Sequence, residues 1–338
     1  MNRFELSKLK MSKSKRTRIS YYKRIFSAYL ISKNSHLSFW HGTPQVNENA
    51  PLHELGEYYM PFLYKAEYPG PFDNQGIPLL DYKGNIGKQY NPIAIAQYAL
   101  GQYNLYKRTN SVEHFDKFLK QANWLVEHLQ PNAQGLYVWN HHFDWEYREG
   151  LKAPWYSALS QGQGISVLVR TFIETGDKKY VEAAEKAFET FNYEIPEGGV
   201  SYTDENGHIW FEEGILLPPT HILNGFIWAI WGIYDFYLHT KGIEAKKLFE
   251  ESVKTLKTNL KLYDIGFWSL YELTNNKLKM IASHFYHSLH IVQLRVMYKI
   301  TEEKLFSHFA DKWDEYNNKK FNRNLALIYK AIFKLVHY

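Results

Sequence analysis

Apolar and polar positions follow the same order in four long segments of the chain: an apolar helix, a short polar turn and an amphipathic helix. The segments start at Pro92, Gln163, Asn224 and Tyr286 and turn at 107–111, 174–178, 239–242 and 300–303. The first helix of a segment is apolar around most of its circumference, as in 223–238, which predicts a buried inner helix. The second helix has one apolar face, which predicts an outer helix against the first.

The connections between these segments contain clusters of turn-forming and aromatic residues at 135–142, 197–202 and 266–271. Such clusters are typical of short strands or hairpins. Helical hairpins that recur in this way bury their apolar faces against one another. The pattern therefore predicts a mainly α protein, an α/α toroid (incomplete barrel) of helical hairpins with short β-hairpins at the cleft end.

Three regions are expected along the chain. Residues 1–33 form a basic N-terminal segment, and residues 34–90 form an irregular cap packed on the toroid. Residues 91–338 form the α/α toroid catalytic domain. Within it, Leu325, Ile328, Ile332 and Phe333 recur at helical spacing and predict a packed final helix.

Composition narrows the function classes. The net charge is +5, but residues 1–33 hold ten Lys and Arg against one Glu, so +9 lies there and −4 remains for the rest. The sequence pI of about 8.9 therefore reflects an end segment, and no nucleic-acid partner is expected. A solvated tail is the ordinary interpretation of this segment, and attraction to an anionic lipid surface or polymer is the alternative.

The cysteine and aromatic contents exclude some kinds of site and favour others. The chain has no cysteine, which excludes disulfides, thiolate zinc sites and cysteine nucleophiles and fits a reducing cytosol. No apolar run reaches the roughly 20 residues of a membrane span. Aromatic residues make up 17% of the chain, which favours a sugar-facing cleft. The stacking candidates are Trp139, Trp145, Trp155 and Trp268.

Two familiar signals are set aside. Gln161-Gly-Gln-Gly lacks the lysine and the strand of a phosphate loop, so nucleotide binding is not expected. His284, His287 and His290 diverge around a helix by about 60° per step, so no metal site is expected there.

Carboxylates and tyrosines stand just before the inner helices. Glu212 and Glu213 precede the helix at 223, Tyr271 ends an apolar run, and Tyr286 leads the fourth inner helix. Taken alone, each of these residues is more readily interpreted as structural. Their shared position at the cleft end makes them candidates together.

These segments resemble, in the same order, the C-terminal catalytic region of D-glucuronyl C5-epimerases. The blocks are Ala153-Pro-Trp-Tyr-Ser-Ala-Leu-Ser-Gln-Gly-Gln-Gly-Ile-Ser, Glu212-Glu213 with Leu223-Asn-Gly-Phe, Leu262-Tyr-Asp-Ile-Gly with Tyr271-Glu-Leu, and Tyr286-His with His290-Ile-Val-Gln-Leu. Upstream, Gly76-Ile-Pro-Leu and Tyr90-Asn-Pro-Ile-Ala-Ile-Ala-Gln-Tyr-Ala-Leu are similar to the segment that leads into that region. The resemblance covers roughly 70–316.

The resemblance implies conversion of D-glucuronosyl to L-iduronosyl units within a heparan-type polymer, without an organic cofactor. It assigns catalytic roles to Glu213, Tyr271 and Tyr286. The expected substrate-binding residues are Tyr90, Tyr156, Gln161, Gln163, Asn224, His287 and His290. The expected partner is an acidic polysaccharide that contains glucuronate. A homodimer, and attachment to the membrane periphery of a cytoplasmic protein through the basic segment, are further expectations.

The sequence departs from the animal enzymes at three points. Gly214 replaces the tyrosine that follows their glutamate, and Thr274 stands near the place of an arginine for which Lys277 or Lys279 could substitute. Only about 50 residues separate Tyr103 from Ala153, so their β-rich domain and its metal site are not expected, which points to a compact bacterial-type enzyme.

Inversion at C5 needs proton removal from one face and proton return to the other, so a glutamate and a tyrosine on two walls would suffice. Glu213 is expected at one face and Tyr286 at the other, with Tyr271 stabilising developing charge. Three alternatives remain. One is a uronate lyase of toroid type, and another is an inactive acidic-polysaccharide-binding toroid. The third is a glycoside hydrolase using carboxylates among Asp144, Glu146, Glu212 and Glu213.

Overall fold

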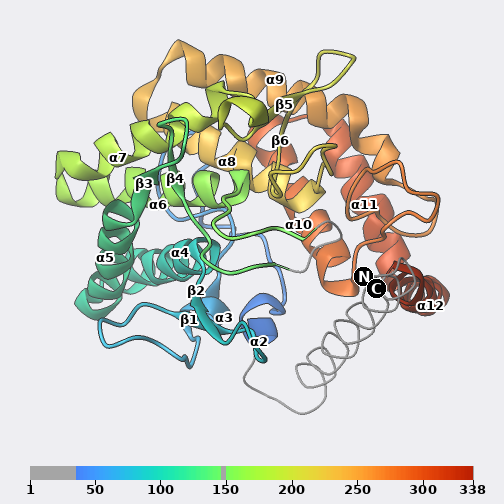
Figure 1. The fold of residues 1–338 in the computed structure, drawn as a ribbon, viewed down its shortest axis with the longest axis horizontal. Helices are drawn as coiled ribbons and strands as arrows, with labels where there is room; N and C mark the ends of the chain where they lie inside the picture. Colours follow the sequence, from blue (N-terminus) through green and yellow to red (C-terminus); the bar gives the residue numbers. More distant parts are fainter. Residues whose placement is uncertain (1–35, 146–149, 338) are drawn as a thin grey trace, which may run out of the picture.

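A computed structural model describes residues 36–145 and 150–337 (Figure 1). The predicted basic segment 1–33 and Glu146 lie outside the described residues. Helices dominate the fold, and short two-stranded sheets connect them. Within the described ranges no helix combines the length and apolar character that a bilayer crossing requires.

The described chain contains the expected four helical hairpins. They are α4 (Pro92–Thr109) with α5 (Val112–Glu127), α6 (Ala158–Thr175) with α7 (Lys178–Phe188), α8 (Leu223–Thr240) with α9 (Ile243–Asn259), and α10 (His284–Thr301) with α11 (Lys304–Asn318). Helix α6 begins five residues before the predicted start at Gln163. The reason is local, because the Ser157 side chain accepts a hydrogen bond from the backbone N–H of Leu159 and caps the helix there.

The first helices of the hairpins form the inner layer. Helix α4 packs on α6, α6 on α8, and α8 on α10. Helices α5, α7, α9 and α11 lie around the periphery (Figure 1). Nearly every side chain of α8 is buried, whereas α9 buries one face, as amphipathic outer helices do. The α/α toroid predicted from the sequence is confirmed.

Two glycines allow α6 and α8 to cross closely. A Cβ atom on Gly232 would lie 2.3 Å from the Cα and carbonyl oxygen of Gly162. A Cβ atom on Gly162 would lie 2.8 Å from the Cα of Ala229. Both distances are shorter than van der Waals contact, so larger residues would force the two inner helices apart.

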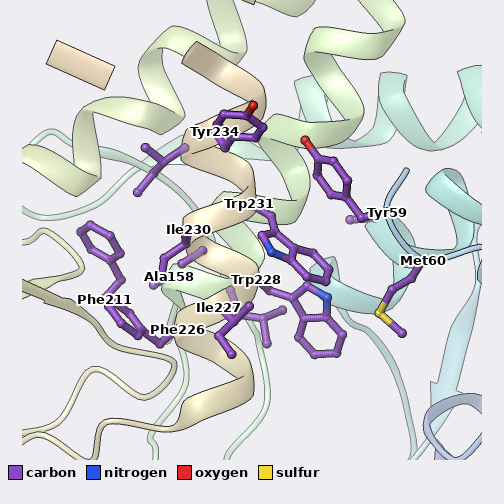
Figure 2. Close-up of a cluster of buried hydrophobic side chains, with 14 of the residues drawn as sticks. Tyr59, Met60, Ala158, Phe211, Phe226, Ile227, Trp228, Ile230, Trp231 and Tyr234 are labelled. Carbon is purple, nitrogen blue, oxygen red and sulfur yellow. The ribbon is translucent and has the colours of Figure 1, made fainter. Parts of the chain in front are cut away.

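The main hydrophobic core surrounds α8 (Figure 2). Trp228 and Trp231 point from this helix toward Tyr59 and Met60, whereas Phe226 lies on the side of Phe211. The Trp231 ring meets the Tyr59 ring edge-on at 5.4 Å between centroids. Aromatic burial on both sides of one helix stabilises the toroid.

A buried ion pair ties the N-terminal region to the inner helices. Arg170 on α6 and Asp235 on α8 are 2.6 Å apart and almost completely buried. The hydroxyl of Tyr59 donates to the same carboxylate at 2.7 Å, and the Arg170 guanidinium donates to the carbonyl of Gly56 at 2.8 Å. Because these groups satisfy one another, the buried charges are compensated.

The connections between hairpins differ in regularity. Strands β3 (Leu129–Pro131) and β4 (Tyr137–Trp139) pair antiparallel with Leu129 opposite Trp139. Strands β5 (Ser201–Thr203) and β6 (Ile209–Phe211) pair with Ser201 opposite Phe211. The third connection has only isolated bridges between Asp264 and Ser269 and between Leu270 and Ile281. Short 3-10 helices η2 (Glu189–Asn192), η3 (Ile195–Glu197) and η4 (Leu260–Tyr263) complete these connections.

Residues 36–90 pack against the toroid. This region holds the short helices α2 (His36–Trp40) and α3 (Leu63–Ala66) and the antiparallel strands β1 (Leu79–Asp81) and β2 (Lys88–Tyr90). Helix α3 packs on α4. The region therefore packs along the inner helices α4 and α8.

Helix α12 (Lys320–His337) packs on α11 and has two different faces. Ala326 and Phe333 are buried against the body of the protein. Ile328 and Ile332, which the periodicity grouped with Phe333, are 58% and 50% exposed. The inward face of α12 reaches the cavity described next.

Candidate functional site

A cavity of about 300 Å³ opens between the inner helices, the N-terminal region and α12. Its walls come from 40–44, 60–65, the N-terminal turns of α4 and α8, the start of α10, and the inward face of α12. The lining is largely aromatic, with a few polar groups. Such a mixture is typical of a small-molecule or sugar site, where aromatic faces supply contact and polar groups fix orientation.

Glu213 lies at the wall formed by the start of α8. Its Oε2 accepts a hydrogen bond from the Asn224 side chain at 3.3 Å. A Cβ atom on Gly225 would lie 2.4 Å from that same oxygen, so the glycine makes room for the carboxylate. Burial first, and then the charge of Glu212, raise the pKa of Glu213 to about 7. A carboxylate with this pKa can take and release protons near neutral pH.

Glu212 points away from the cavity and has a structural environment. It is fully buried, and its Oε1 lies 2.6 Å from Nδ1 of His221. Its Oε2 accepts the backbone N–H groups of Thr220 and His221 at 3.1 and 3.0 Å. This carboxylate therefore holds the segment before α8, which in turn sets the position of Glu213.

Tyr271 and Tyr286 form an aromatic pair on the cavity wall. Their rings meet edge-on, with centroids 4.9 Å apart. The carbonyl of Tyr271 accepts the backbone N–H of Leu223 at 3.1 Å, which fixes the tyrosine to the start of α8. The backbone N–H of Tyr286 donates to the hydroxyl of Ser283, the N-cap of α10. Both tyrosines are thus positioned by helix starts.

Polar atoms of the cavity wall include several that lack a partner within residues 36–145 and 150–337. They are Oε1 of Gln97, Oδ1 of Asn224 and Nε1 of Trp228. An unpaired buried donor or acceptor is costly, and it needs an explanation such as a bound polar group. The three residues line the cavity, and two acceptors and one donor are the kinds of group that pair with the hydroxyl groups of a sugar.

Basic side chains line another part of the wall. Lys65 comes from α3, Lys330 and Lys334 from α12, and His41 from the segment after α2. Burial lowers the pKa of Lys65 well below its usual range. Burial, and then the charge of Lys334, lower the pKa of Lys330 to about 7.

Four of the ten residues predicted for the site line this cavity: Glu213, Tyr271, Tyr286 and Asn224. They come from three separate parts of the sequence, and the fold brings them together at the starts of α8 and α10.

The other six predicted residues lie away from the cavity lining. The hydroxyl of Tyr90 donates to Asp73 on the surface at 2.8 Å, and that of Tyr156 donates to the carbonyl of Gly198 at 2.9 Å. Gln161 is fully buried and its amide group binds Trp139 and the carbonyl of Tyr137.

The remaining three lie on the inner helices α6 and α10, away from the cavity lining. Gln163 is buried and accepts from Gln97, so it stands one layer behind the wall. His287 bonds Ser269 at 2.8 Å and the carbonyl of Trp313 at 3.0 Å, and burial lowers its pKa to about 3. His290 is fully buried beside the same Ser269. These contacts are those of core residues.

The other candidates separate in the same way. Trp145 and Trp155 line the cavity, whereas Trp139 and Trp268 are buried in the core. Lys277 and Lys279 are exposed and do not line the cavity. Asp144 is paired with Lys152 at the surface. Within the described ranges no three His, Asp or Glu residues converge to hold a metal.

Sequence reasoning missed Gln97, Trp228, Lys65, Lys330 and Lys334 as wall residues. Gln97 and Trp228 sit inside apolar helical runs, where nothing in the pattern marks one face as facing a cavity. The two lysines of α12 interrupt an apolar helix four residues apart, which was the available signal.

Comparison with known proteins adds to this geometry. The family model of the D-glucuronyl C5-epimerase C-terminus matches residues 132–315, more than half of the chain. The chain belongs to the D-glucuronyl C5-epimerase family. The resemblance noted in the sequence is therefore confirmed.

Two relatives place the chain within this family. It is 33% identical to the D-glucuronyl C5-epimerase of Caenorhabditis elegans over 219 residues, 60% of this chain and 35% of that protein. It is 27% identical over 278 residues to an uncharacterized protein of Methanocaldococcus jannaschii, covering 75% of this chain and 88% of that one. The chain thus spans about a third of the C. elegans epimerase.

Among solved structures, the cellobiose 2-epimerase of Spirochaeta thermophila is similar, with a TM-score of 0.52 and 12% identity over 88% of this chain and 84% of that one. At this identity the likeness shows the fold of this C5-epimerase family member.

Proposed function

We propose that this protein is a polysaccharide uronate C5-epimerase that converts D-glucuronosyl to L-iduronosyl units of an acidic polysaccharide. One observation carries the proposal: a carboxylate whose pKa is raised to about 7 shares a cavity with two tyrosines. The family membership supports it, as does the name of the C. elegans relative.

The reaction inverts the carbon that bears the sugar carboxylate. The Glu213 carboxylate takes the C5 proton, so the C5–H bond breaks, an O–H bond forms on Glu213, and the electron pair moves into the sugar carboxylate as an enolate. The Tyr286 hydroxyl then returns a proton to the other face of C5, which leaves a phenolate on Tyr286. Exchange with water removes the proton from Glu213 and restores the proton on Tyr286, and the reverse reaction uses the same groups in the opposite order.

The environment of Glu213 suits a base for this step. A base is most effective when its pKa is near the working pH, and burial beside Glu212 gives Glu213 that property. The Asn224 amide donates a hydrogen bond to one carboxylate oxygen at 3.3 Å, and this contact orients the carboxylate. Tyr271, in ring contact with Tyr286, is assigned to stabilise the charge that develops during the transfer.

Solvent isotope exchange tests the proposal directly. The protein is incubated in deuterium oxide with unsulfated glucuronate polymers of differing linkage, and deuterium at C5 is measured by mass spectrometry after depolymerisation. The native protein should introduce deuterium at C5 and generate iduronate. Glu213→Gln and Tyr286→Phe should each lower the exchange rate by at least a hundredfold.

Matched surface substitutions provide the controls. Glu205→Gln changes an exposed glutamate between β5 and β6, and Tyr193→Phe changes an exposed tyrosine. Both should exchange at the native rate. Exchange at the native rate in both Glu213→Gln and Tyr286→Phe would refute the assignment of the two groups.

The products distinguish the alternatives. An unsaturated product that absorbs in the ultraviolet would identify a lyase, which removes the same proton but expels the C4 oxygen. New reducing ends without an unsaturated product would identify a hydrolase, and binding without exchange would identify a carbohydrate-binding toroid. Homodimer formation and membrane attachment through 1–33 stay predictions.

A further inference from the structure

Four basic side chains converge on the cavity from segments far apart in the sequence. Lys65, Lys330, Lys334 and His41 all line it. Lys330 and Lys334 are four residues apart on α12 and therefore share one face of the helix. Burial lowers the pKa of His41, and the charges of Lys65, Lys330 and Lys334 lower it further.

The chain gives Lys65 only neutral partners. Its Nζ donates to the carbonyl of Phe39 at 3.0 Å and to the hydroxyl of Tyr64 at 3.3 Å. The Phe39 ring lies 4.2 Å from the ammonium and the Trp40 ring 5.0 Å, so aromatic faces surround the charge. Within residues 36–145 and 150–337 no carboxylate forms an ion pair with Lys65.

Lys330 is in a similar position. Its Nζ donates to the carbonyl of Ile281 at 3.1 Å, and within the described part of the chain it forms no ion pair. Glu272 contributes negative charge from nearby, but Glu272 does not line the cavity. A lysine that is shielded from water without a paired anion is costly to charge, and the positions of Lys65 and Lys330 on one cavity wall are explained if the anion arrives with a ligand.

We propose that Lys65, Lys330 and Lys334 form the subsite that binds the carboxylate of a uronic acid residue in the cavity. The inference rests on the proposed function for the identity of the sugar. Glu213 lines the same cavity, and the carboxylate of a uronate is bonded to the carbon from which Glu213 would take the proton. Positive charge at that carboxylate also stabilises the enolate, because the second negative charge develops on its oxygens.

The subsite comes from parts of the chain outside the family match. The matched residues are 132–315, whereas Lys65 precedes them and α12 follows them. Inside the match, Lys277 and Lys279 are the lysines that the sequence suggested for this task, and both are exposed away from the cavity. Lys277→Met is therefore a matched control for Lys330→Met.

Binding measurements test the subsite without relying on turnover. The probes are an unsulfated oligosaccharide that contains glucuronate and the same oligosaccharide with its carboxylates reduced to alcohols. Isothermal titration should show that the native protein prefers the acidic probe. Lys65→Met, Lys330→Met and Lys334→Met should each weaken binding of the acidic probe about tenfold or more, as loss of a hydrogen bond to a charged group does, and leave the reduced probe unchanged.

Further variants separate charge from structure. Lys330→Arg should keep most of the preference for the acidic probe, and Lys277→Met should keep all of it. Thermal unfolding of each variant establishes that it is folded, and methionine matches the length of the buried lysine stem. Equal loss for both probes, or native-like preference in all three lysine variants, would overturn the inference.

This readout is independent of the proposed reaction. If the native protein prefers the acidic probe through these lysines but introduces no deuterium at C5, the proposed function fails and the carboxylate subsite stands. If deuterium enters at C5 while the lysine variants keep the native preference, the subsite fails and the proposed function stands.

Discussion

Glu213→Gln should stabilise the protein, and the gain should grow with pH. The pKa of Glu213 rises from its ordinary value of 4.5 to about 7 on folding, because the carboxylate is buried beside Glu212. The folded state therefore binds a proton that the unfolded state has released, and the native protein loses stability as pH rises from about 4.5 to about 7. Glutamine has a similar shape, can keep the contact with Asn224 and does not titrate.

The magnitude follows from the two pKa values. Linkage gives a penalty for native Glu213 of about 1 kcal/mol at pH 5 and about 3 kcal/mol at pH 8. The difference between the free energies of unfolding of the variant and the native protein should therefore increase by about 2.5 kcal/mol over this interval. Any contribution of Glu213→Gln that does not depend on pH cancels in this comparison.

Urea unfolding followed by tryptophan fluorescence at pH 5, 6, 7 and 8 measures this increase. Glu205→Gln, in the exposed turn between β5 and β6, controls for the loss of one surface carboxylate. A constant difference across the pH range, within about 0.5 kcal/mol, would show that folding does not disfavour the Glu213 carboxylate and would refute the reasoning.

Three further predictions use the packing around the inner helices. Gly225→Ala places a Cβ atom 2.4 Å from the Glu213 carboxylate oxygen and 2.8 Å from Cβ of Glu213, so Glu213 must move and isotope exchange at C5 should fall at least tenfold. Gly214→Ala, whose Cβ atom meets its nearest neighbour at 3.8 Å, should stay within twofold of the native exchange rate. Gly232→Ala drives a methyl group against the backbone of α6 and should lower the urea free energy of unfolding by about 3 kcal/mol. Arg170→Met leaves the buried Asp235 carboxylate without its ion-pair partner and should lower the free energy of unfolding by about 3–5 kcal/mol in the same assay. A urea midpoint equal to that of the native protein would contradict this prediction.

The fold could be predicted from the sequence because hydrophobic periodicity reports burial directly. The helix at 223–240 is apolar on all sides, and the structure buries it on all sides. Boundaries were less accurate where a cap decides them. Ser157 caps α6, which therefore begins before Gln163, although the sequence pattern of 158–162 does not distinguish a helix from a loop.

The site was harder to predict because residues that face a cavity and residues that face the core occupy the same positions in the hydrophobic pattern of a helix. His290 shares a face of α10 with Tyr286, yet His290 lies one turn deeper, where neighbouring helices enclose it. Lys65 precedes the toroid by many residues, and only the packing of α3 on α4 brings it to the cavity. Local sequence determines local structure, whereas the cavity wall depends on long-range packing.

Helix α12 closes one side of the cavity although it follows the last residue of the recognised family region. An expression fragment trimmed to 132–315 would therefore omit both this helix and the segment that carries Lys65. Such a fragment would retain Glu213, Tyr271 and Tyr286, but the cavity around them would lose two of its walls and be open to water. Expression fragments of this protein, and sequence searches based on it, should therefore include both Lys65 and α12, which line the cavity outside the matched region.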